Sequence, residues 1–416
     1  IRSMATVATV SLLSVLPFTA QGQTAYQTEI EEVLVSASLV PIAASRSANA
    51  ITVIDSEQLK NRAALSVSDL LRDVPGLAVS RSGVQGSQTQ IRVRGAEANH
   101  LLVLIDGVEV NDPSQGDELN WGTLTTSDIE RIEVIRGPQS AIRGSDALAG
   151  VVNIITRSAD QPFSAKVFAE AGSFSTNKLG LSVGHKAERY DVRLGVSDLE
   201  SEGDNIIANT GANDKDGYQN TNINFKAGVD ASDELKLTYT YNQSDGRNEY
   251  DDAYDLENDL LHSDFDRHSS RVSAQYTSVD GKWSHKVSGS ESNFKNNNFK
   301  YGDDGFVLVG KTESLKQDYQ YVGSRLWEAS EQQISLLLEQ ETEEYKQSGG
   351  YASGSDADKF VDRNTDSIAL EYRVDPVDKV TVAIGARHDN NDAFEDSSTW
   401  KFEGIYRLDD NTRFRV

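Results

Sequence analysis

The segment Leu235-Lys236-Leu237-Thr238-Tyr239-Thr240-Tyr241 decides the fold class, because large apolar or aromatic residues alternate strictly with polar residues along it. A period of two residues is that of a β-strand with one apolar and one polar face. Similar alternation returns after Pro162 in residues 192–196, 272–276, 368–374, 380–386 and 400–408, between polar segments typical of turns and loops. We expect about a dozen strands of roughly ten residues, the length of a tilted strand that crosses a bilayer.

The polar faces of these strands are rich in charge. Their charged residues include Lys166, Glu170, Arg193, Arg271, Glu371, Arg373, Lys401, Glu403 and Arg407. Such a face cannot pack as a dry core without a large desolvation cost, but it can line a water-filled lumen. A soluble β-sandwich with one exposed face would show the same alternation and remains an alternative. The number of strands and the aromatic residues near their ends favour a closed membrane barrel.

The composition narrows the classes of function. The 416 residues include 65 acidic and 40 basic side chains, and the net charge of −25 argues against binding to nucleic acid. No run approaches the roughly 20 apolar residues of a membrane helix. There is no Cys, which excludes disulfides, thiolate metal sites and a Cys nucleophile. Phosphate-loop, nucleophile-elbow and zinc motifs are also absent, so the sequence gives no support for an enzyme.

Residues 41–157 predict a separate α+β domain. Ser66 or Ser68 can cap a short helix that Pro75-Gly76 would stop. The apolar run 101–105 is typical of a strand buried on both faces, and the Asp106-Gly107 pair after it favours a tight hairpin turn. Two further strands are expected at 129–135 and 151–155.

Three segments of this domain resemble the plug domain of TonB-dependent outer-membrane receptors. They are Ile91-Arg92-Val93-Arg94-Gly95, residues 101–112 and residues 129–138, while residues 141–156 look most like the cobalamin (vitamin B12) transporter branch. The matching motif residues are Arg94, Gly95, Asp106, Gly107, Arg136, Gly137, Arg143 and Gly144. The resemblance implies an all-β transmembrane barrel of about 22 strands in the bacterial outer membrane, filled by an N-terminal α+β plug. About twelve strands would fall in residues 162–416, which leaves the barrel incomplete at its C-terminal end.

The N-terminal 40 residues carry two predicted signals. Residues 1–22 are typical of a secretory signal peptide, although a short buried helix is an alternative. Within the periplasmic segment 23–40, Val33, Leu34, Val35, Ser36 and Ala37 are similar to the family's TonB box. Such a β-prone segment can add as a strand to the sheet edge of a TonB-type periplasmic energy-coupling protein. The branch often has Asn-Arg next, where this chain has Ser38-Leu39, which weakens the case for a latch from that arginine to the barrel.

The resemblance also suggests contacts between plug, barrel and ligand. Arg94, Arg136 and Arg143 either pair with barrel carboxylates or make only local contacts within the plug, and the two readings stay open. Gln88, Gln90, Glu97 and the loop 113–117 fall where the cobalamin branch touches its ligand, but the residue types differ. The expected ligand is cobalamin or a related corrinoid, with a ferric siderophore or haem as alternatives.

Acidic loops predict a calcium site. The resemblance places ligands at Asp204, Asp214, Asp216, Tyr250, Asp251 and Asp264, and oxygen-rich sets of this kind suit calcium. An ordinary solvated acidic loop is the alternative. His262 and His268 flank this region, and we expect them to be surface residues without a ligand role.

These observations together predict a monomeric active transporter in outer-membrane lipid. The ligand binds plug and loops, the coupling protein captures the TonB box, and pulling opens the plug. The alternative from another class is a passive porin, which would not need residues 32–37.

Overall fold

The computed structural model describes residues 33–34, 37–206, 215–251, 260–302, 305–327, 331–349, 358–409 and 412–416. The predicted signal peptide lies outside these residues. Residues 164–416 form one antiparallel sheet of thirteen strands within the described part, paired in chain order from β10 to β22. The strands are β10 (Ser164–Ala171), β11 (Asn177–Lys186), β12 (Tyr190–Ser201), β13 (Tyr218–Asp230), β14 (Leu235–Asp251), β15 (Leu260–Thr277), β16 (Trp283–Gly302), β17 (Gly305–Trp327), β18 (Gln332–Gly349), β19 (Lys359–Val377), β20 (Val380–Asn391), β21 (Ser397–Arg407) and β22 (Arg413–Arg415).

The predicted alternation separates the two faces of this sheet. On β14, the side chains of Leu237 and Tyr239 are exposed on one face of the sheet. The side chain of Thr240 points to the opposite face and is buried. Exposed apolar side chains continue along the convex face, for example Val272 on β15 and Ile368 on β19. A hydrophobic outer face suits lipid, and polar inner residues suit contact with a hydrated plug.

The expected strand length of roughly ten residues is wrong for the middle of the sheet. β15, β16 and β17 contain 18, 20 and 23 residues. Their apolar outward residues end before the strands do, and polar residues such as Asp264 and Lys295 follow on the same face. The hairpins therefore continue as strands beyond the apolar band, where water can solvate both faces.

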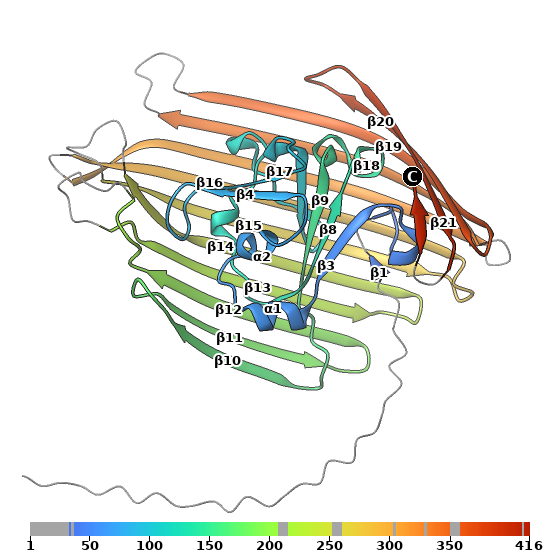
Figure 1. Cartoon of the computed structure of the whole chain (residues 1–416), viewed down its shortest axis with the longest axis horizontal. Coiled ribbons are helices and arrows are strands. Elements are labelled where there is room, and N and C mark those ends of the chain that lie inside the picture. The colour runs from blue at the N-terminus through green and yellow to red at the C-terminus, as the bar shows by residue number, and fades with distance from the viewer. Residues whose placement is uncertain are drawn as a thin grey trace, which may run out of the picture.

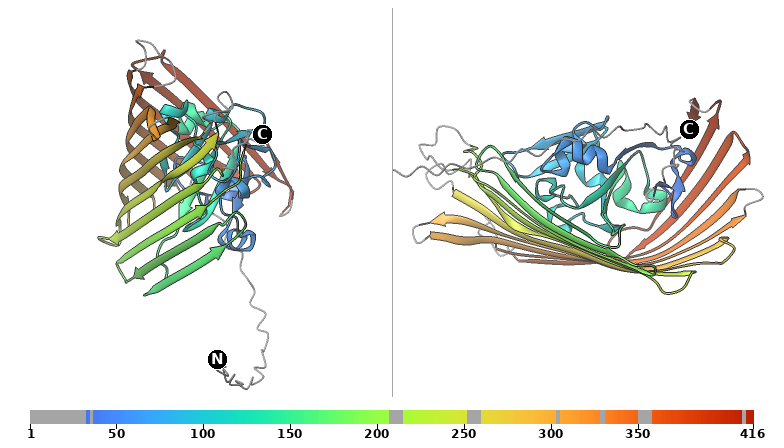
Figure 2. Two further views of the ribbon diagram at one scale, coloured as in Figure 1. Left: turned by 90° about the vertical axis from the view of Figure 1, so that its left-hand side faces the viewer. Right: turned by 90° about the horizontal axis from the view of Figure 1, so that it is seen from below.

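The sheet is curved, and the N-terminal domain lies in its concave side (Figures 1 and 2). Within the described residues, β10 and β22 are the two ends of the sheet and do not pair with each other. No helix in this described part is both long and apolar enough to cross a membrane. The predicted architecture, a β-barrel segment with an N-terminal α+β plug, is confirmed, while the total of about 22 strands stays a prediction.

The plug is built on a five-stranded sheet with the order β3-β8-β9-β6-β7, in which β6 and β9 are parallel. Its predicted strands and helix are present, and Asp106 and Gly107 have the positive φ angles, 51° and 80°, of the expected hairpin turn. The elements are β1 (Val33–Leu34), β2 (Ile42–Ala43), β3 (Ala50–Ile54), α1 (Ser56–Arg62), α2 (Val67–Leu71), β4 (Leu77–Arg81), β5 (Thr89–Val93), β6 (Leu101–Ile105), β7 (Val108–Glu109), β8 (Ile129–Arg136), α3 (Ser140–Arg143) and β9 (Gly150–Thr156), with short 3-10 helices at Ala44–Arg46, Ala98–His100, Pro113–Gln115, Trp121–Thr123 and Ser145–Ala147.

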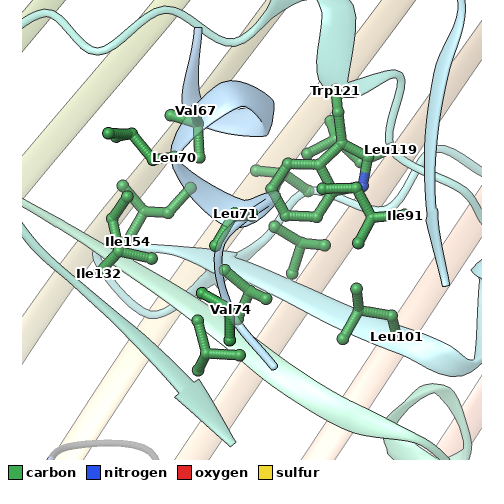
Figure 3. Packing of buried hydrophobic residues seen from close by; sticks show 14 of the residues in the cluster. Val67, Leu70, Leu71, Val74, Ile91, Leu101, Leu119, Trp121, Ile132 and Ile154 are labelled. Atoms are coloured by element: carbon green, nitrogen blue, oxygen red, sulfur yellow. The ribbon is translucent and has the colours of Figure 1, made fainter. Parts of the chain in front are cut away.

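The larger of two buried apolar clusters in the plug lies around α2, β8 and β9. Leu70 and Leu71 of α2 pack with Ile132 of β8 and Ile154 of β9, and Trp121 closes the cluster (Figure 3). Burial of each large apolar side chain contributes roughly 1.5–3 kcal/mol, so this core stabilises the plug as a unit of its own. We call the curved sheet β10–β22 the wall, and one of its residues, Phe294 of β16, packs against this cluster.

Candidate functional site: the interface between plug and barrel wall

The Asp106-Gly107 turn joins the plug to the wall. The two Asp106 oxygens accept hydrogen bonds from Thr156 Oγ1 at 2.6 Å and from Lys226 Nζ on β13 at 3.0 Å. The Gly107 carbonyl accepts from Arg271 Nη1 on β15 at 3.0 Å. A Cβ at Gly107 would require the Arg271 guanidinium to shift, and the φ of +80° is one that other residues rarely adopt, so both features favour glycine at this turn.

A second buried contact lies on β12. Arg193 donates to both oxygens of Asp128 from Nε, at 3.0 and 3.1 Å, and from Nη2 to Oδ1 at 2.6 Å. Both side chains are about a tenth exposed, at 11% and 9%. Bidentate arginine–carboxylate pairs fix orientation as well as distance, so this contact sets the register of the plug against the wall.

The strongest concentration of charge surrounds Lys316 on β17. Its Nζ lies 2.7 Å from Glu109 and 3.5 Å from Asp146, both on the plug, and 3.2 and 2.9 Å from Glu341 and Glu343 on β18. The Lys316 side chain is 3% exposed. We call these five residues the Lys316 cluster.

Arg363 on β19 extends this cluster through an ion pair with Glu343. Two cations then face four carboxylates, which leaves an excess of negative charge if every group is ionised. Burial, followed by repulsion from Asp146 and Glu341 and opposed by Lys316, raises the pKa of Glu109 well above its ordinary value. Burial works against ionised Asp146, yet Lys316 and the Glu109 hydrogen bond lower the pKa of Asp146. The two shifts together favour a proton on Glu109 rather than on Asp146, with Lys316 Nζ donating to Glu109 Oε1 at 2.7 Å.

Glu109→Gln tests this arrangement, because an amide reproduces both hydrogen bonds of a protonated carboxyl. The bound proton of Glu109 stabilises the folded plug fully below the ordinary carboxyl pKa and no longer does so once the pH rises through the raised pKa. We expect wild type and variant to differ by less than about 1 kcal/mol near pH 6. At alkaline pH the variant should unfold at the higher temperature, as followed by circular dichroism. A loss of several kcal/mol in the variant near pH 6 would show that Glu109 is ionised.

The three predicted plug arginines behave differently from one another. Arg136 donates to Pro75 O at 2.5 Å and to Thr52 Oγ1 at 2.9 Å, so its described contacts stabilise the plug itself. Arg94 has a positive φ of 52° and is exposed, next to Gly95. Arg143 faces the wall: burial lowers its pKa, opposed mainly by Glu339 on β18. Among the glycines beside these arginines, Gly137 lies near Arg94, and Gly144 lies close to Arg387 on β20.

The predicted TonB box is described only in part, and its described residues contact the plug. Val33–Leu34 forms β1 and pairs with Ile42–Ala43, Val35 and Ser36 lie outside the described residues, and Ala37 is fully buried.

Ser38 and Leu39, the two residues that stand where the related branch often has Asn-Arg, make their own contact with the wall. Ser38 Oγ and Leu39 N both donate to Glu371 Oε2 on β19, the second at 3.2 Å, and Arg143 Nη2 donates to Ser38 O at 2.8 Å. Residue 38 thus links the N-terminal segment to both plug and wall.

The predicted ligand positions lie in and around β5, with Gln88 just before the strand, Gln90 within it and Glu97 after it. Gln88 is exposed, Gln90 donates to Glu118 at 2.6 Å, and Glu97 is 3.7 Å from Arg92. These residues offer amides and carboxylates. Their role in binding stays a prediction.

Gly86 explains how the loop before β5 meets the wall. Its φ is +86°, and an added Cβ would overlap the ring of Tyr218 on β13. Gly86→Ala should destabilise the protein by about 2–4 kcal/mol, since left-handed strain and overpacking add. Gly116→Ala is the matched control, because Gly116 has a φ of +72° but nothing within 4 Å, and strain alone costs about 1–2 kcal/mol. Equal losses of thermal stability in the two variants would contradict the Tyr218 contact.

The predicted calcium ligands do not assemble in the described residues. Asp216 is buried and accepts from Ile206 N at 2.7 Å, while Asp264 makes two hydrogen bonds to Arg247, at 2.7 and 3.0 Å. Asp214 lies outside the described residues, whereas Asp204, Tyr250 and Asp251 lie within them. No group of three or more acidic or His side chains that could hold a metal occurs in the described part. Calcium binding stays a prediction.

The two flanking histidines differ in environment. His262 is buried, not on the surface as predicted, because it stacks on Phe299 at 4.7 Å and meets the edge of Phe306 at 4.4 Å. His268 lies 3.8 Å from Asp266 and is about one third exposed. Contacts with neighbouring residues of the described chain explain the positions of both side chains.

The residues that hold plug and wall together were largely missed by the sequence analysis. Lys316, Glu109 and Asp146 were not singled out, and Glu371 was noted only as part of a charged face. The one available signal was the excess of charge on the inner faces of the strands, because such charge needs partners across the interface.

Comparisons with known proteins agree with this geometry. A family model described as the TonB-dependent receptor plug domain matches residues 43–151. The vitamin B12 transporter BtuB of Photobacterium profundum is 27% identical over 365 residues, which are 88% of this chain and 54% of that protein. The vitamin B12 transporter BtuB of Vibrio vulnificus is 34% identical over 202 residues, 48% of this chain and 33% of that protein. The chain thus spans between a third and about half of these relatives.

Solved structures share the fold. A ferric enterobactin receptor (PfeA) from Pseudomonas aeruginosa matches with a TM-score of 0.73 and 17% identity, over 88% of this chain and 61% of that one. The siderophore receptor PirA from Acinetobacter baumannii matches with a TM-score of 0.71 and 20% identity, over 86% and 59%. Residues 43–151 thus match the plug domain of TonB-dependent receptors, and the chain is similar in sequence to vitamin B12 transporters and in fold to siderophore receptors.

Proposed function

We propose that the protein imports a large, scarce ligand across the outer membrane by TonB-dependent active transport. The observation that carries the proposal is a plug seated on the wall by polar contacts, with its N-terminal segment docked on β19 through residue 38. Polar contacts can be exchanged for contacts with water when the plug moves, unlike a large apolar interface. A pull on residues 33–37 would therefore act on the pairing of β1 with β2 and on the contact between Ser38 and Glu371. The work comes from a TonB-type periplasmic partner, and no catalytic step is involved.

The proposed ligand is cobalamin or a related corrinoid. The support is the similarity to vitamin B12 transporters, which extends over 88% of this chain in one relative. A ferric siderophore is the second candidate, because the solved structures with this fold include siderophore receptors. Equilibrium binding of cyanocobalamin, ferric enterobactin and haem to the purified receptor, with and without calcium, distinguishes these ligands and also tests the predicted calcium site.

Deletion of residues 32–37 tests the mechanism. We expect uptake of the bound ligand to fall to background, because the partner then has no strand to capture. Ligand affinity should change less than about twofold, since the predicted ligand loops lie elsewhere in the plug. A passive porin would take up ligand at the same rate with or without these residues. Undiminished uptake by the deletion variant would therefore contradict active transport.

A further inference from the structure

A cavity of about 540 Å³ lies between the plug and strands β15 to β21. Residues 39–41, directly after the TonB box, line one part of it. Six cationic side chains and seven acidic ones line it as well, and three of the cations, Lys286 of β16, Arg271 of β15 and Arg143 of the plug, act on one another. A volume of this size accommodates a small molecule or a chemical group of a larger one.

Lys286 is the unusual member of this group. It is half-buried on the inner face of β16, where its neighbours across the strands are Gln275 and Val322, neither of them acidic. Among the described residues it makes no hydrogen bond or ion pair. The charged groups that act on it are Arg271 and Arg143, both cations.

The two arginines have counter-charges of their own. Arg271 interacts with Asp318, Asp106 and Glu339, and it donates to Gly107 O and Ser288 Oγ. One of its nitrogens, Nε, is nevertheless buried without a partner. Arg143 interacts with Glu339, Glu371 and Glu133. No carboxylate acts on Lys286 in this way.

A partly desolvated ammonium beside two guanidinium groups is costly unless an anion is close by. Ammonium and guanidinium groups are the side chains that bind phosphate and carboxylate, through charge-assisted hydrogen bonds. Gln275, Ser284 and Ser290 line the same cavity and add neutral donors.

We propose that Lys286, together with Arg143 and Arg271, forms a binding site for an oxyanion, a phosphate or carboxylate group, between plug and wall. The anion has two sources: dissolved oxyanion that enters from the periplasm, or an anionic group of the transported ligand during its passage. The second source rests on the proposed function, and the first does not.

Chemical labelling of the intact receptor tests the site without mutation. Pyridoxal 5′-phosphate condenses with a lysine amine with release of water, and borohydride reduces the imine to a stable secondary amine. We expect labelling of Lys286, read by peptide mass spectrometry, to fall about tenfold when inorganic phosphate exceeds its Kd tenfold. Lys282 serves as the internal control, because it lies nearby in the exposed turn beside Asp280. Unchanged labelling of Lys286 in phosphate, or equal protection of Lys282, would overturn the proposal.

A matched pair of variants measures the contribution of the charge. Lys286→Gln should raise the Kd of inorganic phosphate at least about tenfold in calorimetry, because it removes a charge-assisted hydrogen bond. Lys282→Gln should leave that Kd within about twofold, as expected for an exposed surface charge. Equal Kd values for the two variants would count against the site even if labelling had succeeded.

Uptake by Lys286→Gln identifies the source of the anion. Cyanocobalamin carries a phosphodiester, and cobinamide lacks it. Slower uptake of cyanocobalamin alone assigns the site to the transported ligand, whereas unchanged uptake of both, with weakened phosphate binding, assigns it to dissolved oxyanion. Phosphate binding is measured on the purified receptor, so it can succeed even if the proposed transport function fails.

Discussion

Replacing Lys316 with methionine is expected to weaken the plug–wall interface by about 3–5 kcal/mol, the cost of removing one partner from a buried ionic group. Lys316 Nζ lies within 4 Å of four carboxylates, two from the plug and two from β18. Methionine fills the space of the lysine stem but leaves these carboxylates without their shared cation. Arg363 touches only Glu343 among them, so it cannot replace Lys316.

Hydrogen exchange measures this effect where it arises. Amide protection in β6 and β7 should fall at least about a hundredfold in Lys316→Met, which corresponds to about 2.7 kcal/mol or more at 1.36 kcal/mol per tenfold change. Lys311→Met is the matched control, because Lys311 pairs with Glu313 at 2.8 Å on the exposed outer side of the same strand. In that variant the plug–wall interface should lose less than about 1 kcal/mol of stability. Equal exchange in the two variants would show that the Lys316 cluster does not hold the plug.

The sequence predicts the fold well because local patterns determine it. Alternation along β14 specifies which side chains face lipid, and the Asp106-Gly107 pair specifies a hairpin by its φ preferences alone. Both signals come from residues that are adjacent in the chain. The wall strands are longer than predicted because a strand can continue into water after its apolar band has ended.

The interface is harder to predict because its partners are far apart in the chain. Lys316 and Glu109 are 207 positions apart, and Ser38 and Glu371 are 333 positions apart. Nothing in the alternation of β17 distinguishes Lys316 from any other inward polar residue. Similarly, a glycine follows both Arg136 and Arg143, yet only the position of α3 against the wall makes Arg143 the residue that faces barrel carboxylates.

Replacing Glu371 with alanine is expected to release the N-terminal segment in the absence of ligand. Glu371 is buried and accepts hydrogen bonds from Ser38, Leu39 and Arg373. The variant loses all three and leaves Arg373 beside Glu403 alone, at 3.6 Å. Breaking a buried charge pair of this kind costs about 3–5 kcal/mol.

Ser38→Ala separates the docking contact from the stability of the wall. It removes one hydrogen bond to a charged group, worth about 1.5–3 kcal/mol, and leaves Glu371, Arg373 and Glu403 intact. The released population should therefore rise about tenfold or more in Ser38→Ala, and further in Glu371→Ala. Arg46, which pairs with Asp375 at 3.1 Å farther along β19, still holds the segment at a second point. Release should accordingly extend from the TonB box to residue 39 and stop before Arg46.

A spin label at Ser36→Cys reports this release directly, and the absence of native Cys makes the labelling specific. We expect the mobile component of the spectrum to be larger in Ser38→Ala and Glu371→Ala than in the otherwise unaltered receptor. Glu344→Ala is the control, because Glu344 pairs with Lys346 at 3.1 Å on the outer side of the wall. An equal mobile component in all of these proteins would show that the contact of Ser38 with Glu371 does not restrain the box. A mobile component that grows only when Ser38 or Glu371 is changed would instead make this contact an early step of plug release, since Ser38 is the first residue after the box and its hydroxyl donates to the wall.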